Sequence, residues 1–322
     1  MRAFIMILLL LLSINIAFSQ SGESPIDLKI LKSVIKITTS PDKNSQFYSG
    51  TGFLVSPRVT NGKDTEDAFY LVTNKHLVGN WNPADKNFTE FYKYLELSFR
   101  RQKNIGKNLN DPLRIDIAGI NDSLNSELVT LHPDSSVDVA IILINKILSQ
   151  SDAIDYTFCD ISFLRTFDKI VEYGFNIGDQ VFVLGYPLGI IPLNNLYPIA
   201  KSGYLSNIPG ERIAFDFQVE TRDGKIRMMQ VEGKILLVDG LIVPGNSGGP
   251  VVLPSLIKTR YNPDSGDYEM RKQATENQVI GILSGNFGPS GLSLVWSTDY
   301  INEVINIELE KNGWKQIPRK GQ

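Results

Sequence analysis

The stretch that decides the fold occupies residues 244–250 and reads Pro244-Gly245-Asn246-Ser247-Gly248-Gly249-Pro250. Apolar runs stand on both sides of it, Leu241-Ile242-Val243 before and Val251-Val252-Leu253 after. The pattern predicts two strands joined by a tight turn, because glycine adopts backbone angles that other residues resist. A serine on such a turn presents its hydroxyl at a fixed position, beside backbone N–H groups. This is the geometry of a nucleophile next to an oxyanion hole; a plain turn between two strands is the alternative.

A serine hydroxyl becomes a good nucleophile only when a base removes its proton, and the chain has two histidines. His76 follows the apolar run Ala68–Val72, which predicts a position at the end of a buried strand. His132 precedes Pro133, which restricts it to an extended or turn conformation of the kind more often found at the surface. We therefore predict that His76 is the base, with His132 as the alternative.

A third group must orient the imidazole and stabilise its positive charge. Asp138 is the best candidate, because it stands at the head of the uncharged, largely β-branched run Val139–Ile144. A carboxylate buried there is unfavourable unless it is hydrogen-bonded or paired. A surface cap at the strand start is the alternative for Asp138, and Asp134 and Asp116 are rival partners for the histidine.

Three motifs, in the order His, Asp, Ser, resemble the signatures of trypsin-like (chymotrypsin-fold) serine proteases. They are Thr73-Asn74-Lys75-His76, Asp138-Val139-Ala140 and Gly245-Asn246-Ser247-Gly248-Gly249-Pro250. Other stretches resemble the bacterial Deg/HtrA branch of that family: Gly50-Thr51-Gly52-Phe53-Leu54-Val55, Gly185-Tyr186-Pro187-Leu188-Gly189, Ser202-Gly203-Tyr204-Leu205-Ser206 and Val279-Ile280-Gly281-Ile282. The resemblance covers roughly residues 28 to 305.

The resemblance implies an all-β fold of two six-stranded antiparallel β-barrels with a C-terminal helix. It also implies a catalytic triad of His76, Asp138 and Ser247, with the backbone N–H groups of Gly245 and Ser247 as the oxyanion hole. Ser284 resembles the serine that supports the catalytic aspartate, and Gly285 follows it in the segment that would pair with an extended substrate.

The same resemblance places Leu241 at the floor of the primary specificity pocket and Gly291 on one wall. An acidic residue at the floor would select lysine or arginine, whereas leucine cannot. We therefore expect cleavage after small or medium apolar residues. Asn246 departs from the aspartate that digestive enzymes of this family pair with a newly cut N-terminus, so activation by that route is not expected.

The expected organisation follows from these motifs. Residues 1–19 combine Arg2, the apolar run Ile5–Leu12 and small residues near the end, which is typical of a secretory signal peptide; a retained N-terminal anchor is the alternative. A protease domain would occupy residues 20–305, with barrel one at about 28–150 and barrel two at about 175–298. Residues 299–322 would form a C-terminal helix and tail, which leaves no room for a PDZ domain.

Several short apolar runs are expected to be strands, among them 34–39, 52–55, 68–72, 137–144, 180–185, 215–219, 228–238, 279–284 and 292–297. Residues 145–170 are expected to link the barrels, helical or irregular in structure. The polar stretch 259–277 reads as an exposed hairpin inserted between strands.

Composition and charge limit the kinds of partner, compartment and cofactor that we expect for this protein. Loss of residues 1–19, which hold one arginine and no acid, lowers the net charge from −3 to −4, which argues against nucleic acid or an anionic membrane. The single cysteine, Cys159, cannot form an internal disulfide, and this favours a bacterial exported protein, periplasmic or secreted. We expect no cofactor and no metal, because two histidines and one cysteine far apart in sequence do not form the usual zinc sets.

These features predict an exported serine endopeptidase that acts on protein or peptide substrates without stable membrane insertion after signal cleavage. The alternative is a trypsin-fold binding module without catalysis. An esterase with the same triad is a further alternative, but the strand–turn–strand setting of Ser247 differs from the α/β-hydrolase elbow, which leads into a helix. Whether the resting enzyme is active or requires a ligand stays open, as does its oligomeric state.

Overall fold

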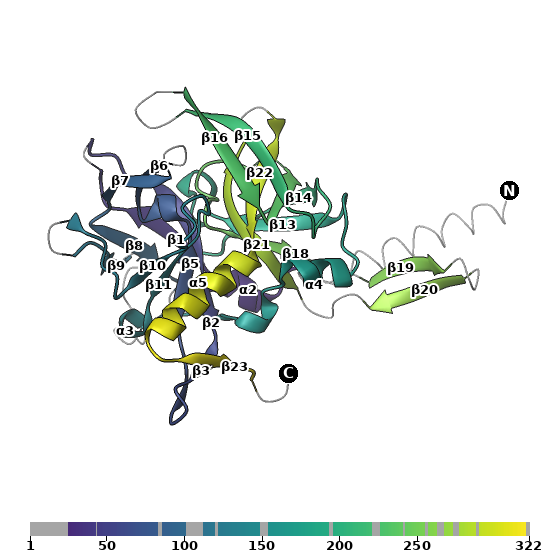
Figure 1. Cartoon of the computed structure of the whole chain (residues 1–322), viewed down its shortest axis with the longest axis horizontal. Coiled ribbons are helices and arrows are strands. Elements are labelled where there is room, and N and C mark those ends of the chain that lie inside the picture. The colour runs from purple at the N-terminus through teal and green to yellow at the C-terminus, as the bar shows by residue number, and fades with distance from the viewer. Residues whose placement is uncertain are drawn as a thin grey trace, which may run out of the picture.

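The computed structural model (Figure 1) describes residues 25–42, 44–82, 86–100, 112–119, 122–148, 154–192, 196–220, 226–240, 242–254, 257–262, 267–272, 277–287 and 290–319. The predicted signal peptide at 1–19 and the predicted pocket residue Leu241 lie outside these ranges. Two β-structures lie side by side, with the C-terminal helix α5 running across the front of both in this view.

The first half is one antiparallel sheet in the order β10-β11-β5-β2-β1-β8-β9. Its strands are β1 (Val34–Thr39), β2 (Ser49–Ser56), β5 (Tyr70–Thr73), β8 (Tyr94–Ser98), β9 (Leu113–Asp116), β10 (Val129–Leu131) and β11 (Ala140–Leu143). The sheet curls around buried side chains that include Ile37, Leu54, Leu71, Leu97 and Ile142. Over the described ranges it does not close, because β9 and β10 form no ladder. The expected all-β architecture of two β-units is therefore confirmed, and over the described ranges this half is a curled, open sheet.

Two small hairpin structures extend the first half. β3 (Arg58–Thr60) and β4 (Thr65–Asp67) flank the predicted turn, where the Asn61 side-chain oxygen accepts hydrogen bonds from the backbone N–H groups of Lys63 and Asp64 at 2.9 and 2.7 Å. β23 (Lys315–Ile317) adds to β3 as a third strand. β6 (Gly79–Asn82) pairs with β7 (Asn87–Phe91).

The link between the halves combines short helices with one short strand. It contains α3 (Asn145–Leu148), β12 (Cys159–Asp160), η3 (Ile161–Phe163) and α4 (Phe167–Glu172). β12 pairs in parallel with β2, and the buried Cys159 Sγ lies 3.3 Å from the hydroxyl of Ser33 in α2 (Leu28–Ser33). This arrangement agrees with the expected helical or irregular link and fastens the N-terminal helix to it.

The second half is a closed six-stranded barrel in the order β13-β14-β17-β22-β21-β18. Its strands are β13 (Gln180–Gly185), β14 (Ile199–Leu205), β17 (Ile235–Asp239), β18 (Pro250–Leu253), β21 (Gln278–Asn286) and β22 (Leu292–Ser297). Val183, Leu236, Val251, Ile280 and Val295 are among the residues that fill its core. Closure pairs the strands on both sides of Ser247 with neighbours, which gives the serine turn a rigid base.

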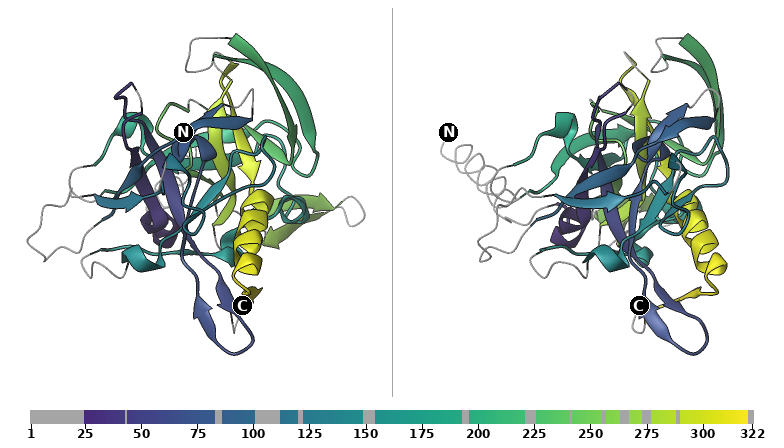
Figure 2. Two further views of the ribbon diagram at one scale, coloured as in Figure 1. Left: turned by 60° about the vertical axis from the view of Figure 1, so that its left-hand side comes forward. Right: turned by 90° about the vertical axis from the view of Figure 1, so that its left-hand side faces the viewer.

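Two hairpins project from this barrel. β15 (Ile213–Glu220) and β16 (Ile226–Gly233) form a long ribbon that extends at the end of the molecule opposite to the β3–β4 hairpin (Figure 2). β19 (Ile257–Asn262) and β20 (Asp267–Lys272) form the second, which reaches away from the body in Figure 1. The expectation of a hairpin within 259–277 is therefore confirmed. At its expected tip, residues 262–267, Asn262 pairs with Asp267, and residues 263–266 lie outside the described residues.

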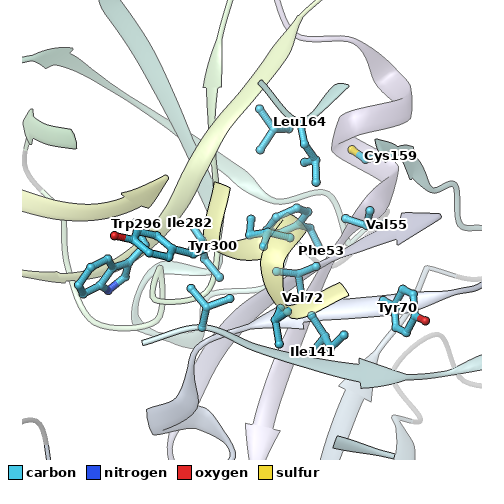
Figure 3. Packing of buried hydrophobic residues seen from close by; sticks show 14 of the residues in the cluster. Phe53, Val55, Tyr70, Val72, Ile141, Cys159, Leu164, Ile282, Trp296 and Tyr300 are labelled. Atoms are coloured by element: carbon cyan, nitrogen blue, oxygen red, sulfur yellow. The ribbon is translucent and has the colours of Figure 1, made fainter. Parts of the chain in front are cut away.

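α5 (Thr298–Lys311) is the C-terminal helix that the sequence predicts. Ser297 caps its N-terminus, with the hydroxyl oxygen accepting from Asp299 N at 3.2 Å. Its buried residues, including Ile301, Val304 and Ile305, join the shared cluster shown in Figure 3. That cluster also contains Phe53 and Val72 of the first sheet and Ile282 and Trp296 of the second barrel. One continuous core therefore fixes the two halves to each other.

Candidate active site

Ser247 lies in the turn between β17 and β18, and glycines shape this turn. Gly245 and Gly248 have φ angles of +96° and +84°, which strongly favour glycine. A Cβ at Gly248 would lie 1.9 Å from the Thr51 carbonyl oxygen, so the turn packs directly on β2 of the first sheet. Ser247 is thereby held at the seam between the two halves.

His76 and Asp138 come from neighbouring strands of the first sheet. β5 ends at Thr73 and β11 begins at Ala140, and these two residues are paired across the ladder. His76 lies in η1 (Lys75–Leu77), just beyond β5. Its Nδ1 is 2.7 Å from Oδ2 of Asp138, and its backbone N–H donates to Oδ1 at 3.2 Å. These contacts fix the imidazole through Nδ1 and leave Nε2 for a reacting group.

Asp138 is a buried carboxylate, only 1% exposed. The Ser284 hydroxyl donates to its Oδ2 at 2.5 Å, and the Asn74 side-chain amide donates to its backbone oxygen at 2.7 Å. The bond from Ser284 and the two contacts from His76 offset the loss of water around the charge, while the bond from Asn74 holds the backbone of Asp138. The predicted supporting role of Ser284 agrees with this geometry.

Lys75 is a buried cation beside this pair. Its ammonium donates to the backbone oxygen of Asp134 at 2.7 Å. Burial lowers the pKa of Lys75 to about 8, and the negative charges of Asp138 and Asp134 oppose that shift. The sequence assigns no role to this residue, because the burial of a lysine side chain leaves no trace in a motif.

Ser284 also connects the serine turn to the aspartate. The Ser247 hydroxyl donates to the backbone oxygen of Ser284 at 3.1 Å, while the Ser284 hydroxyl bonds Asp138. A chain of contacts therefore joins Ser247, Ser284, Asp138 and His76. Within the described residues no hydrogen bond runs directly from Ser247 to His76, so the serine hydroxyl is turned toward Ser284 in this state.

Two backbone N–H groups of the serine turn have no acceptor among the described residues: those of Gly245 and Ser247. The preceding carbonyl, that of Pro244, accepts from Leu188 N at 2.7 Å and is thus directed to η4 (Pro187–Gly189). Two free donors flanking a serine hydroxyl can bind a developing oxyanion. The predicted oxyanion-hole residues are therefore both available for that role.

A sequence model described as a trypsin-like peptidase domain matches residues 50–255. The chain belongs to this family. The structure is similar to that of the Rv3671c protease from M. tuberculosis in its active form, with 17% identity, a TM-score of 0.45 and coverage of 91% of this chain and 86% of that one. It is also similar to the MamO protease domain from Magnetospirillum magneticum, with 14% identity, a TM-score of 0.41 and coverage of 86% and 97%. Comparison with curated protein sequences found no match.

The chain is thus a trypsin-like peptidase in fold and family, and Asn246 is the residue that precedes its candidate nucleophile, Ser247. Asn246 is fully buried, and its side-chain amide donates to Val243 O at 3.1 Å. Its Oδ1 is buried without a partner among the described residues, against Gly185. A neutral side chain at this position needs no ammonium ion to compensate it.

The predicted substrate-binding residues fall into different places. Ser284 and Gly285 lie on β21, and a Cβ at Gly285 would meet nothing within 4 Å, so this side of the strand is open. Gly291 is exposed, with φ +76°, and its carbonyl accepts from Gly240 N at 3.3 Å. Leu241, next to Gly240, lies outside the described residues. One bridge was missed from sequence: the Asn286 side chain donates to Ile242 O at 3.0 Å and ties β21 to the segment before the serine turn.

His132, the alternative base, was expected in a surface turn and is instead buried, at 4% exposed. Its Nε2 lies 3.0 Å from Oε2 of Glu303 in α5, and its Nδ1 accepts from Asp134 N at 3.2 Å. Its ring packs edge-on against Tyr300. Nε2 therefore joins the loop before Asp138 to α5, Nδ1 is engaged within that loop, and neither nitrogen contacts Ser247.

The rival carboxylates have other partners. Asp134 accepts from the backbone N–H and hydroxyl of Ser136 at 2.8 and 2.6 Å, and Asp116 forms an exposed ion pair with Arg114.

In the part of the chain that the structure describes, no group of three His, Cys, Asp or Glu side chains is arranged to hold a metal. Over the same part, the helices are too short or too polar to cross a membrane.

Proposed function

We propose that this trypsin-like peptidase is an exported serine endopeptidase in which Ser247 is the nucleophile, His76 the general base and acid, and Asp138 the group that orients His76. The observation that carries the proposal is the contact chain from Ser247 through Ser284 and Asp138 to His76, beside the N–H groups of Gly245 and Ser247, which have no acceptor among the described residues. Ser247 and Ser284 come from the second half of the molecule, and Asp138 and His76 come from the first.

The reaction begins when the Ser247 hydroxyl rotates from Ser284 to Nε2 of His76. Ser247 Oγ attacks the peptide carbonyl carbon while its proton passes to Nε2, and Asp138 stabilises the resulting imidazolium. The carbonyl oxygen becomes negative and accepts hydrogen bonds from Gly245 N–H and Ser247 N–H, each typically worth about 3 kcal/mol of barrier. His76 then donates its proton to the leaving amine, and water hydrolyses the acyl-enzyme by the same steps in reverse order.

The resting contact of Ser247 suggests how substrate starts the cycle. The Ser284 carbonyl that now accepts from Ser247 Oγ lies on β21, beside the open face at Gly285. An extended peptide that pairs with β21 would bring its own N–H to this carbonyl. Competition for the acceptor would free the serine hydroxyl for His76, consistent with the looser catalytic hydrogen bonds of enzymes without substrate.

Substrate preference and location complete the proposal. The leucine at position 241 cannot pair with a basic side chain, so we propose cleavage after small or medium apolar residues. A peptide-library digest that yields cuts mainly after lysine or arginine would contradict this preference.

The apolar run in residues 1–19 supports export, and N-terminal sequencing of the protein recovered from outside the cytoplasm is expected to begin at Gln20.

Covalent labelling with a fluorophosphonate tests the nucleophile. The wild-type protein should gain the mass of one phosphonyl group, Ser247→Ala should gain none, and His76→Ala should react at least 100-fold more slowly. Ser206→Ala, which removes a partly exposed serine directly after β14 of the same barrel, is the matched control and should label like wild type. Equal labelling of wild type and Ser247→Ala would contradict the assignment.

The binding module and the esterase predict other outcomes. A non-catalytic module would leave folded wild-type protein unlabelled, with or without a peptide ligand. An esterase would hydrolyse an activated ester in a Ser247-dependent manner but leave the matching peptide amide intact. The proposal requires cleavage of internal peptide bonds in an unfolded protein, detected by mass spectrometry and lost in Ser247→Ala.

A further inference from the structure

We infer that Thr51 is a positioning residue that holds the oxyanion-hole turn in its donor-presenting conformation from across the seam. The inference rests on the proposed function of Ser247 and the turn around it. Thr51 belongs to β2 in the first half, whereas the turn belongs to the second half. From sequence, the stretch Gly50-Thr51-Gly52 resembles a family motif but indicates no role for Thr51.

Three hydrogen bonds connect Thr51 to the other half. Its hydroxyl donates to the Gly245 carbonyl at 2.7 Å and accepts from Tyr186 N at 3.1 Å. Its backbone N–H donates to the Ser247 carbonyl at 2.8 Å. Thr51 is fully buried, so water cannot replace these bonds when one is removed.

The bonds fall on the peptide groups that directly follow Gly245 and Ser247, next to the peptides that carry the two donor N–H groups. The carbonyls of Gly245 and Ser247 belong to the same residues whose N–H groups form the hole. Gly245 is the softest point of the turn, because glycine with a φ of +96° can rotate its peptides at little steric cost. The Thr51 hydroxyl limits that rotation after Gly245, while Leu188 N limits it before Gly245 by bonding Pro244 O.

The Thr51 hydroxyl also extends the support to a third segment. By accepting from Tyr186 N while donating to Gly245 O, it bridges the start of η4 and the serine turn. Its own carbonyl accepts from the Thr73 hydroxyl at 2.9 Å, on the strand that leads to His76. One side chain and its backbone therefore set the hole in a fixed position relative to the base. Electrostatic stabilisation depends on such preorganisation, since donors that must reorient during the reaction stabilise the transition state less.

The test uses Thr51→Val, which keeps the β-branched shape and removes the hydroxyl, and Thr51→Ser, which keeps the hydroxyl. The matched control is Thr39→Val. Thr39 is also fully buried in the first sheet, and its hydroxyl accepts from Tyr48 N at 3.0 Å, away from the serine turn. Thermal unfolding should report similar losses of stability for Thr51→Val and Thr39→Val.

Activity separates the two positions. For a peptide amide substrate, Thr51→Val should lower kcat roughly 10- to 100-fold with KM within about threefold, because the hole acts in the transition state. Thr51→Ser should recover kcat to within about threefold of wild type, and Thr39→Val should match wild type. A kcat for Thr51→Val within twofold of wild type, or an equal loss in Thr39→Val, would overturn the inference.

A second measurement does not depend on catalysis. In protein labelled with ¹⁵N-glycine, the Gly245 amide resonance should shift or broaden in Thr51→Val and stay in place in Thr39→Val. An unchanged Gly245 resonance in Thr51→Val would overturn the positioning role even if Ser247 proved not to be a nucleophile. Conversely, Ser247→Ala activity equal to wild type would reject the proposed function alone, since the resonance still reports the turn.

Discussion

At the scale of single residues, Ser284 contacts both halves of the candidate site through different atoms. Its hydroxyl donates to Asp138 and its backbone oxygen accepts from Ser247. Replacement by alanine removes the first contact and keeps the second. The variant therefore isolates how much the buried carboxylate depends on this one donor.

We expect Ser284→Ala to lower the free energy of unfolding by about 1 to 3 kcal/mol, since a hydrogen bond to a buried charged group is lost. Ser293→Ala is the matched control in the neighbouring strand, because the Ser293 hydroxyl is buried without a partner among the described residues. That control should be neutral or slightly stabilising. Urea denaturation measures both, and equal effects of the two substitutions would show that the Ser284 donor does not matter.

Lys75 predicts a pH dependence of stability. Its pKa is lowered to about 8 in the folded protein, from 10.5 for an ordinary lysine, chiefly by burial. Between these values the unfolded chain binds more protons than the folded one, so Lys75 makes the protein more stable as pH rises. The stability of wild type relative to Lys75→Met should therefore increase from pH 8 to pH 10.5, by at most about 1.4 kcal/mol per pH unit.

Urea denaturation of both proteins at several pH values gives this difference directly. Lys63→Met, at an exposed turn position, is the control and should show no comparable trend relative to wild type. A flat difference for Lys75→Met across the window would mean that the Lys75 ammonium is not desolvated in the folded state.

At the scale of secondary-structure elements, α5 provides a direct test of core packing. Ile305 is fully buried against the shared core, whereas Ile307, two residues later, is 38% exposed. We expect Ile305→Ala to lower the free energy of unfolding by about 2 to 5 kcal/mol and Ile307→Ala by less than about 1 kcal/mol. Chemical denaturation of the two variants should separate them; similar losses would contradict the observed orientation of the helix.

Elements also show where sequence-based prediction succeeds. β1, β13 and β22 were expected at their observed bounds, because each is a continuous apolar or β-branched run. β23 was not expected, since Lys315-Gln316-Ile317 has no strand pattern and is ordered by pairing with β3. β11 is shorter than expected, because Val137 to Val139 leave the ladder where Asp138 turns toward His76.

The candidate site shows the same difference between residues in local motifs, which were predicted, and contacts between distant strands, which were not. His76, Asp138, Ser247 and Ser284 were predicted because each lies in a motif that reads along the chain. Contacts across the seam were not predictable in that way. The hydroxyl bridge of Thr51 and the burial of His132 depend on how distant strands come together, which no local pattern encodes.

At the scale of the whole molecule, the two halves differ in closure but share one hydrophobic core. The open first sheet provides His76, Asp138 and Thr51, and the closed barrel provides the serine turn. α5 packs against strands of both halves. The geometry of the candidate site therefore depends on global assembly, so any substitution that loosens the shared core should reduce activity before it unfolds either half.

Cys159 gives that assembly an internal reporter. The thiol is 1% exposed, and burial raises its pKa to about 12, so the reactive thiolate is nearly absent in the folded protein at neutral pH. An aromatic disulfide reagent should modify the Cys159 thiol only when α2 transiently separates from the link between the halves. We expect the modification rate to increase with urea concentration. The rate should also be higher in Ile305→Ala than in the wild-type protein. The rate of modification of this single thiol thus measures how often the folded protein opens, and absorbance follows it without any label being introduced.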